Sequence, residues 1–134
     1  MVKLWQILVL VALTAAVSGC CSVCNFSTGF NTGFDKSTFT LSSYEYEVKE
    51  MTLGSDSKLS YTVTANGGSV DIYLLDEANY EDYADNGMDW DTDYYDEANP
   101  SVSGTFSPGK AGTYYFVVEN LGDEDVQVTW DISW

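Results

Sequence analysis

The chain has 134 residues, of which 21 are Asp or Glu and only 5 are Lys, so its net charge is −16 at pH 7. This charge argues against nucleic acid as a partner, because binding to phosphate backbones depends on Lys and Arg displacing counterions. The sequence contains neither His nor Arg, which removes Ser-His-Asp and Cys-His nucleophile pairs and His-based zinc sites. Since 15% of the residues are aromatic, we expect one folded domain and not a disordered chain.

The first 20 residues have the layout of an export signal. Lys3 precedes an apolar run over residues 4–17, which is short for a membrane span of roughly 20 residues. Val17-Ser18-Gly19-Cys20 resembles the lipobox of bacterial and archaeal lipoproteins, which implies cleavage before Cys20 and a lipid on its thiol. We expect residues 1–19 to be a signal peptide and the mature protein to be anchored in the cell membrane, facing the extracellular or periplasmic side. The alternatives are an uncleaved signal anchor and a free Cys20.

Two further cysteines, Cys21 and Cys24, follow the lipobox. A C-x-x-C pair can be redox-active at the start of a helix in a thioredoxin-like fold, but no βαβ pattern surrounds this pair. We expect a second acylation or a small local disulfide instead. Residues 20–36 are rich in Gly, Ser and Thr, and are predicted to be a flexible tether between the lipid and the domain.

Residues 37–134 have the pattern of an all-β domain, an antiparallel β-sandwich of seven to eight strands. Polar residues alternate with apolar ones, most clearly at Val126, Val128, Trp130, Ile132 and Trp134. Residues 114–118 are continuously apolar, which is typical of a central strand covered on both faces. The alternation changes parity before Met51, which predicts a β-bulge there. Turn-forming residues separate the strands, and only residues 76–85 can form a helix, of one or two turns.

Two stretches resemble GOLD-like domains and the related pre-peptidase C-terminal sandwiches. Residues 68–83 look like a strand followed by a short turn segment. The stretch Gly-Thr-Phe-Ser-Pro-Gly-Lys-Ala-Gly-Thr-Tyr-Tyr-Phe-Val-Val-Glu-Asn at residues 104–120 looks like the second half of the same domain, and the resemblance covers roughly residues 45–134. GOLD-like domains are protein-interaction modules and the pre-peptidase sandwiches are accessory binding domains. The resemblance therefore implies binding, and it carries over no catalytic residue.

A segment rich in carboxylates lies between Asp76 and Glu97, with ten acidic residues and no basic one. Carboxylates at positions i, i+2 and i+4 of a loop can converge on Ca²⁺, which takes roughly six to eight oxygen ligands. The segment is not an EF-hand, because Tyr94 replaces the required Gly and Pro100 replaces the closing Glu. The candidate metal ligands are Asp89, Asp91, Asp93, Asp96 and Glu97. The alternative is a solvated acidic hairpin tip.

Aromatic residues accompany these carboxylates and can stack on sugar rings, with Trp90, Tyr94 and Tyr95 as the candidates. The alternative is that the rings pack against the end of the sandwich. Two-carboxylate hydrolases need only Asp and Glu, but no recognisable cleft motif is present, and we expect no enzymatic activity.

Two hypotheses for the function follow from the sequence. The favoured one is a non-enzymatic, lipid-anchored cell-surface protein whose sandwich serves protein interaction or envelope structure. The second is a module that binds Ca²⁺, carbohydrate or both through residues 76–97. The expected partner is an envelope protein or a glycan, in addition to the membrane, and Ca²⁺ is the one cofactor considered.

Overall fold

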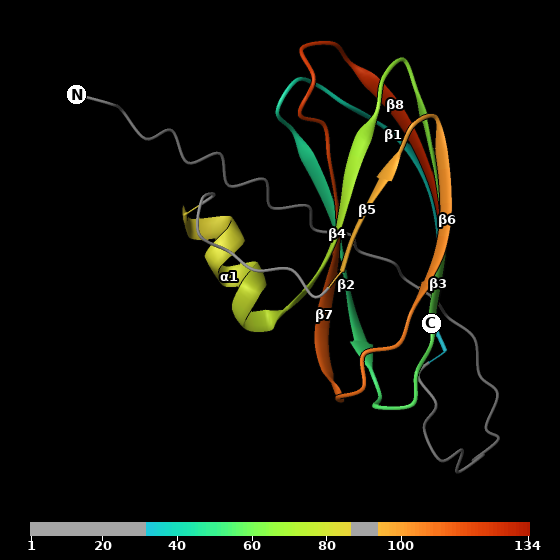
Figure 1. The fold of residues 1–134 in the computed structure, drawn as a ribbon, viewed down its shortest axis with the longest axis vertical. Coiled ribbons are helices and arrows are strands. Elements are labelled where there is room, and N and C mark those ends of the chain that lie inside the picture. Colours follow the sequence, from blue (N-terminus) through green and yellow to red (C-terminus); the bar gives the residue numbers. More distant parts are fainter. Residues whose placement is uncertain (1–31, 87–93) are drawn as a thin grey trace, which may run out of the picture.

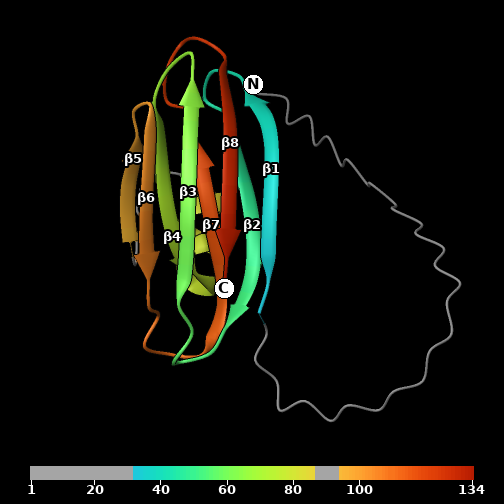
Figure 2. The same cartoon turned by 90° about the vertical axis from the view of Figure 1, so that its right-hand side faces the viewer.

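Eight strands and one helix make up the computed structural model, which describes residues 32–86 and 94–134. The elements are β1 (Phe34–Leu41), β2 (Tyr46–Leu53), β3 (Leu59–Asn66), β4 (Val70–Asp76), α1 (Glu77–Asn86), β5 (Tyr94–Ala98), β6 (Ser101–Phe106), β7 (Gly112–Glu119) and β8 (Val126–Ser133). Sheet A has the strand order β1-β8-β3-β6 and sheet B has the order β2-β7-β4-β5. The sheets stack face to face (Figures 1 and 2), which confirms the predicted antiparallel β-sandwich.

Consecutive strands cross between the sheets at every connection except the one from β4 to β5, which stays in sheet B. All of the neighbouring strands pair antiparallel. Eight strands that alternate between two antiparallel sheets in this way form a jelly-roll sandwich. The crossings bring the first and last strands together, and β1 pairs with β8 from Phe34 opposite Ser133 to Leu41 opposite Val126.

The main core lies between the two sheets. Strand β8 contributes the alternating residues Val126, Val128, Trp130 and Ile132, each at most 3% exposed, as the sequence predicts. Sheet B contributes large buried side chains such as Leu53, Ile72 and Phe116. Because side chains of a strand alternate between its two faces, the polar partners of the β8 residues face solvent.

Strand β2 has no bulge, so the bulge predicted before Met51 is wrong. Its pairing with β7 runs without interruption from Tyr46 opposite Glu119 to Leu53 opposite Gly112. Met51 and Leu53 are buried in the main core, whereas Val48 packs into a second apolar cluster. The parity of the apolar pattern changes because apolar residues occupy both faces of β2, and not because a residue is inserted.

The second cluster lies on the outer face of sheet B, beneath α1 (Figure 1). Its buried members are Tyr73, Leu75, Tyr83 and Val117. Helix α1 begins after Asp76, whose Oδ1 accepts a hydrogen bond from the Asn79 N–H at 2.9 Å and so caps the helix. Strand β7 is therefore covered on both faces, as its continuous apolar run predicts.

Two segments differ from the predicted organisation. Helix α1 lies where the sequence allowed one, at residues 76–85, but its 10 residues make it longer than one or two turns; the other end of the acidic segment forms β5, and residues 87–93 lie outside the described residues. Strand β1 begins at Phe34, inside the predicted tether of residues 20–36. Within residues 32–86 and 94–134, no helix has the length and apolar character needed to cross a membrane. The predicted signal peptide lies outside these ranges.

A charged contact joins the two sheets along the edge where β1 and β2 lie. The Lys49 ammonium on β2 lies 2.6 Å from the Asp35 carboxylate on β1, and the Trp130 indole N–H donates to the same carboxylate at 2.9 Å. The hydrogen bond from Lys49 is the main reason that the pKa of Asp35 lies below its ordinary value of 3.8. The side chains of Lys49 and Asp35 are only 32% and 20% exposed, so solvent screens this pair less than a surface ion pair.

We expect the substitution Asp35→Asn to lower the free energy of unfolding by about 1 kcal/mol at pH 7. A carboxyl whose folded pKa is depressed stabilises the fold above its unfolded pKa and loses this contribution as the pH falls through the folded value. The difference between Asp35→Asn and the unsubstituted protein should therefore shrink below about pH 4. Denaturant unfolding at several pH values measures it.

The matched control is Asp131→Asn, which breaks the exposed Lys36–Asp131 pair on the outer face of sheet A. The side chains of Lys36 and Asp131 are 61% and 41% exposed. We therefore expect Asp131→Asn to change the free energy of unfolding by close to zero. Equal losses in both variants, or a loss in Asp35→Asn that persists unchanged at pH 2, would contradict the role of Asp35.

Candidate functional site

A hollow lined mostly by tyrosines opens on the outer face of sheet B, beside α1. It has a volume of about 370 Å³. Its walls come from the β1–β2 turn, from β2, β4 and β7, from the last turns of α1 and from the residue after Asn120. The lining residues are Tyr44, Tyr46, Tyr73, Tyr83, Ala84, Glu119 and Leu121. We refer to it below as the tyrosine hollow.

Strand register brings the sheet residues of the tyrosine hollow together. Tyr46 of β2 lies opposite Glu119 of β7, and Glu119 lies opposite Asp71 of β4. Side chains at such paired positions lie on the same face of the sheet about 5 Å apart. Tyr73 follows Asp71 by two residues and therefore projects from the same face.

The aromatic rings of the tyrosine hollow meet at large angles and do not form a flat stack. The ring of Tyr83 lies 5.3 Å from that of Tyr46, at an interplanar angle of 78°. It lies 6.1 Å from the ring of Tyr73, at an angle of 48°. One turn earlier in α1, the ring of Tyr80 stacks on Tyr115 of β7 at 3.9 Å, which holds the helix against the sheet.

Tyr44 has an unusual backbone conformation. Its φ is 60°, in the left-handed region that non-glycine residues rarely occupy and that costs roughly 1–3 kcal/mol. Its side chain is 67% exposed, so burial of the ring does not offset this cost. A strained, exposed residue at the rim of a hollow is an observation that points to a functional role.

The fully buried Asn120 holds the β1–β2 turn and with it Tyr44. The Tyr44 N–H donates to the Asn120 carbonyl at 2.8 Å, and the Asn120 N–H donates to the carbonyl of Glu45 at 2.9 Å. The Asn120 side-chain amide donates to the Leu41, Ser42 and Glu124 carbonyls at distances of 3.2, 3.1 and 2.8 Å. These bonds satisfy the buried amide and fix both the position of the turn and the start of the loop before β8.

Among the residues that the structure describes, Glu119 is the one carboxylate that lines the tyrosine hollow. Burial raises its pKa, and the hydroxyls of Tyr83 and Tyr73 oppose this rise by hydrogen bonding to the charged form. Burial also raises the pKa of both tyrosine hydroxyls, which stay protonated at neutral pH. The hollow therefore combines neutral phenol rings with a partly desolvated negative charge.

The structure describes two of the five residues proposed from sequence as metal ligands, Asp96 and Glu97, and it does not bring these two together. Asp89, Trp90, Asp91 and Asp93 lie outside the described residues. Asp96 accepts a hydrogen bond from the Tyr61 hydroxyl at 2.6 Å, whereas its neighbour Glu97 lies on the opposite face of β5. Among the described residues, no group of three or more acidic or cysteine side chains is arranged to hold a metal ion. The calcium site remains a prediction.

The candidate stacking residues Tyr94 and Tyr95 point to opposite faces of β5. Tyr94 packs against the main core, where its ring lies 6.2 Å from that of Tyr61 and 6.0 Å from that of Phe106. Tyr95 is half-exposed on the outer face of sheet B, and its hydroxyl donates to Asp71 at 3.1 Å. The two rings therefore cannot stack on one ligand from the same side.

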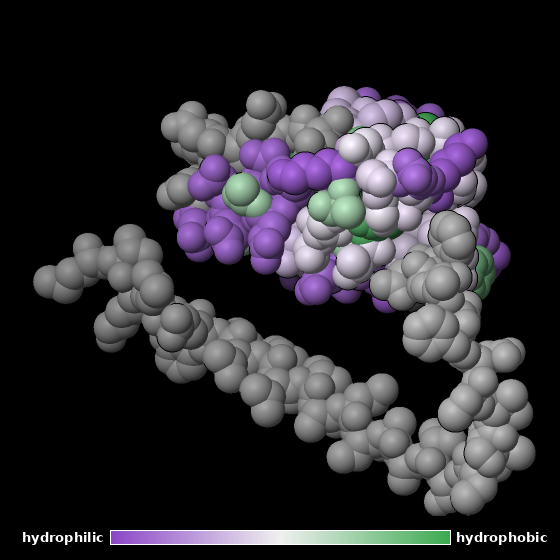
Figure 3. Space-filling view, turned by 90° about the horizontal axis from the view of Figure 1, so that it is seen from below, coloured by the Kyte–Doolittle hydropathy of each residue, from purple (hydrophilic) through white to green (hydrophobic). Residues whose placement is uncertain are grey.

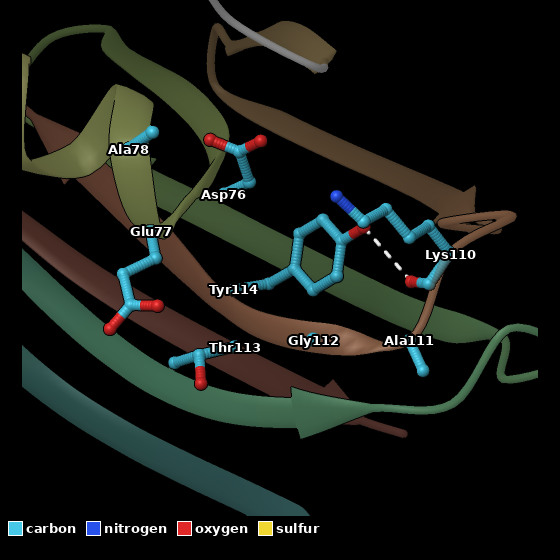
Figure 4. Close-up of a pocket in the computed structure, with 8 residues that line it drawn as sticks. All are labelled: Asp76, Glu77, Ala78, Lys110, Ala111, Gly112, Thr113 and Tyr114. Atoms are coloured by element: carbon cyan, nitrogen blue, oxygen red, sulfur yellow. Dashed lines mark hydrogen bonds between the residues drawn. The ribbon is translucent and has the colours of Figure 1, made fainter.

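A second hollow, of about 310 Å³, lies at the start of α1 (Figure 4). Lys110 extends toward Asp76 in this view, whereas Tyr114 points toward Lys110 and donates its hydroxyl to the Lys110 carbonyl at 3.0 Å. Asp76 is already the cap of α1, so its carboxylate compensates the helix dipole. The tyrosine hollow is the stronger candidate site, because it combines several aromatic rings with a partly desolvated carboxylate.

Sequence reasoning missed the tyrosine hollow, because its residues come from four separate segments of the chain. Tyr44 and Tyr46 fit the alternating pattern of a strand, and Glu119 belongs to the stretch that resembles the second half of a GOLD-like domain. The signal that was available is the tyrosine in the apolar run of β4, Tyr73, which projects to the opposite face from Ile72 and Leu74. An aromatic residue in the outward register indicates that the outer face is covered or used.

Comparisons with known proteins show the fold. No protein-family model and no curated protein matches the chain. The pre-peptidase C-terminal domain of a collagenase from Bacillus anthracis is similar in structure, with a TM-score of 0.52 and 19% identity, over 72% of this chain and 88% of that one. The periplasmic lysozyme inhibitor PliG of Aeromonas hydrophila has a TM-score of 0.47 and 16% identity, over 81% of this chain and 90% of that one. The first similarity confirms the resemblance to a pre-peptidase sandwich at the level of fold.

We expect Tyr83→Phe to raise the pKa of Glu119 further, because it removes a hydroxyl that favours the charged carboxylate while the burial of Glu119 persists. A carbon-13 NMR titration of the glutamate carboxyls measures this change. Tyr95→Phe is the control, because the Tyr95 hydroxyl contacts Asp71 and not Glu119. A Glu119 pKa that falls in Tyr83→Phe, or that titrates below 4.5 in the unsubstituted protein, would contradict this electrostatic description.

Proposed function

We propose that the protein is a non-enzymatic, lipid-anchored cell-surface protein whose sandwich binds a partner through the outer face of sheet B. The observation that supports this proposal is the gathering of exposed apolar side chains at the tyrosine hollow. Tyr44, Tyr46 and Leu121 are 67%, 43% and 50% exposed, and all three line it. Exposed aromatic clusters of this kind mark binding surfaces, because tyrosine contributes apolar area and a hydrogen-bonding hydroxyl together.

The charge of the protein limits which partners this surface can attract. Hydrophilic side chains gather mainly over the side of the molecule that carries α1 (Figure 3). Helix α1 itself has four carboxylates and no basic residue, at Glu77, Glu81, Asp82 and Asp85. A surface bordered by negative charge favours partners that are cationic or present a cationic group, and it repels anionic ones.

The proposed anchor is a lipid on Cys20, at the predicted lipobox Val17-Ser18-Gly19-Cys20. The thiolate of cysteine is readily alkylated, and two acyl chains hold a protein stably at a membrane where one does not. Strand β1 begins at Phe34, so about 14 residues would separate the anchored cysteine from the sandwich. An extended segment of that length spans about 45 Å, enough to hold the sandwich clear of the head groups.

Mass spectrometry of the native protein tests the anchor. We expect a mature form that begins at Cys20 and carries the added mass of a lipid. Cys20→Ser should yield a protein without the lipid mass that still carries residues 1–19, whereas the control Cys24→Ser should keep the mature form with a lipid on Cys20. A native form that still begins at Met1, or an unmodified Cys20 thiol, would contradict the proposal.

A further inference from the structure

We propose that the tyrosine hollow binds a quaternary ammonium group, with the exposed rings of Tyr44 and Tyr46 as its walls, the largely buried rings of Tyr73 and Tyr83 as its floor, and Glu119 as the counter-charge. This inference rests on the proposed binding function and names the chemistry of the ligand. The cation would sit against the ring faces, which carry the negative part of the aromatic quadrupole. Each such contact contributes more when the cation is desolvated than when it is exposed.

The angles between the rings favour a compact, rounded ligand. The rings of Tyr46 and Tyr83 are nearly perpendicular, at 78°, and Tyr73 is tilted by 48° from Tyr83. A sugar stacks best on a flat platform, whereas rings at large angles surround a group that presents the same methyl surface in every direction. The hollow, at about 370 Å³, lies at the small end of the range for ligand pockets.

The polar groups of the hollow fit an organic cation better than a metal ion. Ca²⁺ needs roughly six to eight oxygen ligands, and within residues 32–86 and 94–134 only Glu119 contributes a carboxylate to the lining. Quaternary ammonium accepts no hydrogen bond and donates none, so it needs only a negative charge and aromatic faces. Burial disfavours the negative charge on Glu119, and a cation beside the carboxylate would offset that cost.

The strained conformation of Tyr44 gives an independent reason to assign a ligand here. Glycine at position 44 would adopt φ 60° without the cost that tyrosine incurs. The protein has tyrosine there despite this cost, which indicates that the ring itself has a role. Asn120 fixes this turn through both its backbone and its side chain. The backbone of Tyr44 is therefore fixed before a ligand arrives, and its hydroxyl donates to Asp123 at 3.4 Å, which together reduce the entropy lost on binding.

A trimethylammonium group can come from a free choline-like molecule or from a choline-bearing lipid head group. The head group carries a phosphate next to the cation, and the chain has a net charge of −16. We therefore expect choline itself to bind more tightly than the surface of phosphatidylcholine vesicles.

The test is a calorimetric titration of the full-length protein, in a maltoside detergent, with choline chloride at constant ionic strength. We expect saturable binding to choline and none to its uncharged isostere, in which a tert-butyl group replaces the trimethylammonium. Tyr46→Leu and Glu119→Gln should each weaken binding by about 3- to 30-fold. Phe34→Leu, which changes an exposed ring on sheet A, and Glu47→Gln, which removes an exposed charge from β2, should leave it within about twofold.

The variant Tyr44→Gly separates the role of the ring from folding. It should keep or raise the melting temperature, because glycine tolerates the left-handed backbone, and it should weaken choline binding. Equal binding of choline and its isostere, no binding up to about 100 mM, or equal effects of Tyr46→Leu and Phe34→Leu would overturn the assignment. A lipidated Cys20 without choline binding would refute the ligand alone, and choline binding with an unmodified Cys20 would refute the proposed anchor alone.

Discussion

The structure depends on the burial of β4 and β7 on both of their faces. Ile72 and Phe116 point into the space between the sheets, while Tyr73 and Val117 point the other way and are also buried. A two-layer sandwich covers only the inner face of each sheet, so an outward apolar surface requires a further element. Helix α1 supplies that cover, and the chain inserts it at the one connection that stays within sheet B.

The helix covers the outer face only in part, and the tyrosine hollow lies where its cover ends. Near the middle of the helix, the ring of Tyr80 stacks flat on the ring of Tyr115, so the two rings are in direct contact there. Toward its end, Tyr83 meets Tyr46 and Tyr73 at an angle, and the hollow opens over Glu119. The same requirement for cover that places α1 on sheet B thus gathers tyrosines from distant segments around one carboxylate.

The sequence predicted the sandwich well because alternation between polar and apolar residues reports directly on strands with one buried face. It failed at β2, where Val48 and Met51 are apolar on opposite faces, and alternation cannot distinguish that case from a bulge. The hollow could not be predicted, since tyrosine occurs in cores, at interfaces and on surfaces alike. Its assembly depends on strand register, which joins Tyr46 to Glu119 across 73 positions of the chain.

The packing of α1 on sheet B is tested most directly by nuclear Overhauser spectra of the full-length protein with labelled tyrosines. If the helix covers the outer face as described, cross-peaks connect the ring of Tyr80 with that of Tyr115 and the ring of Tyr83 with that of Tyr46. Absence of both contacts, in spectra that show the pairing of β4 with β7, would contradict the cover and with it the tyrosine hollow.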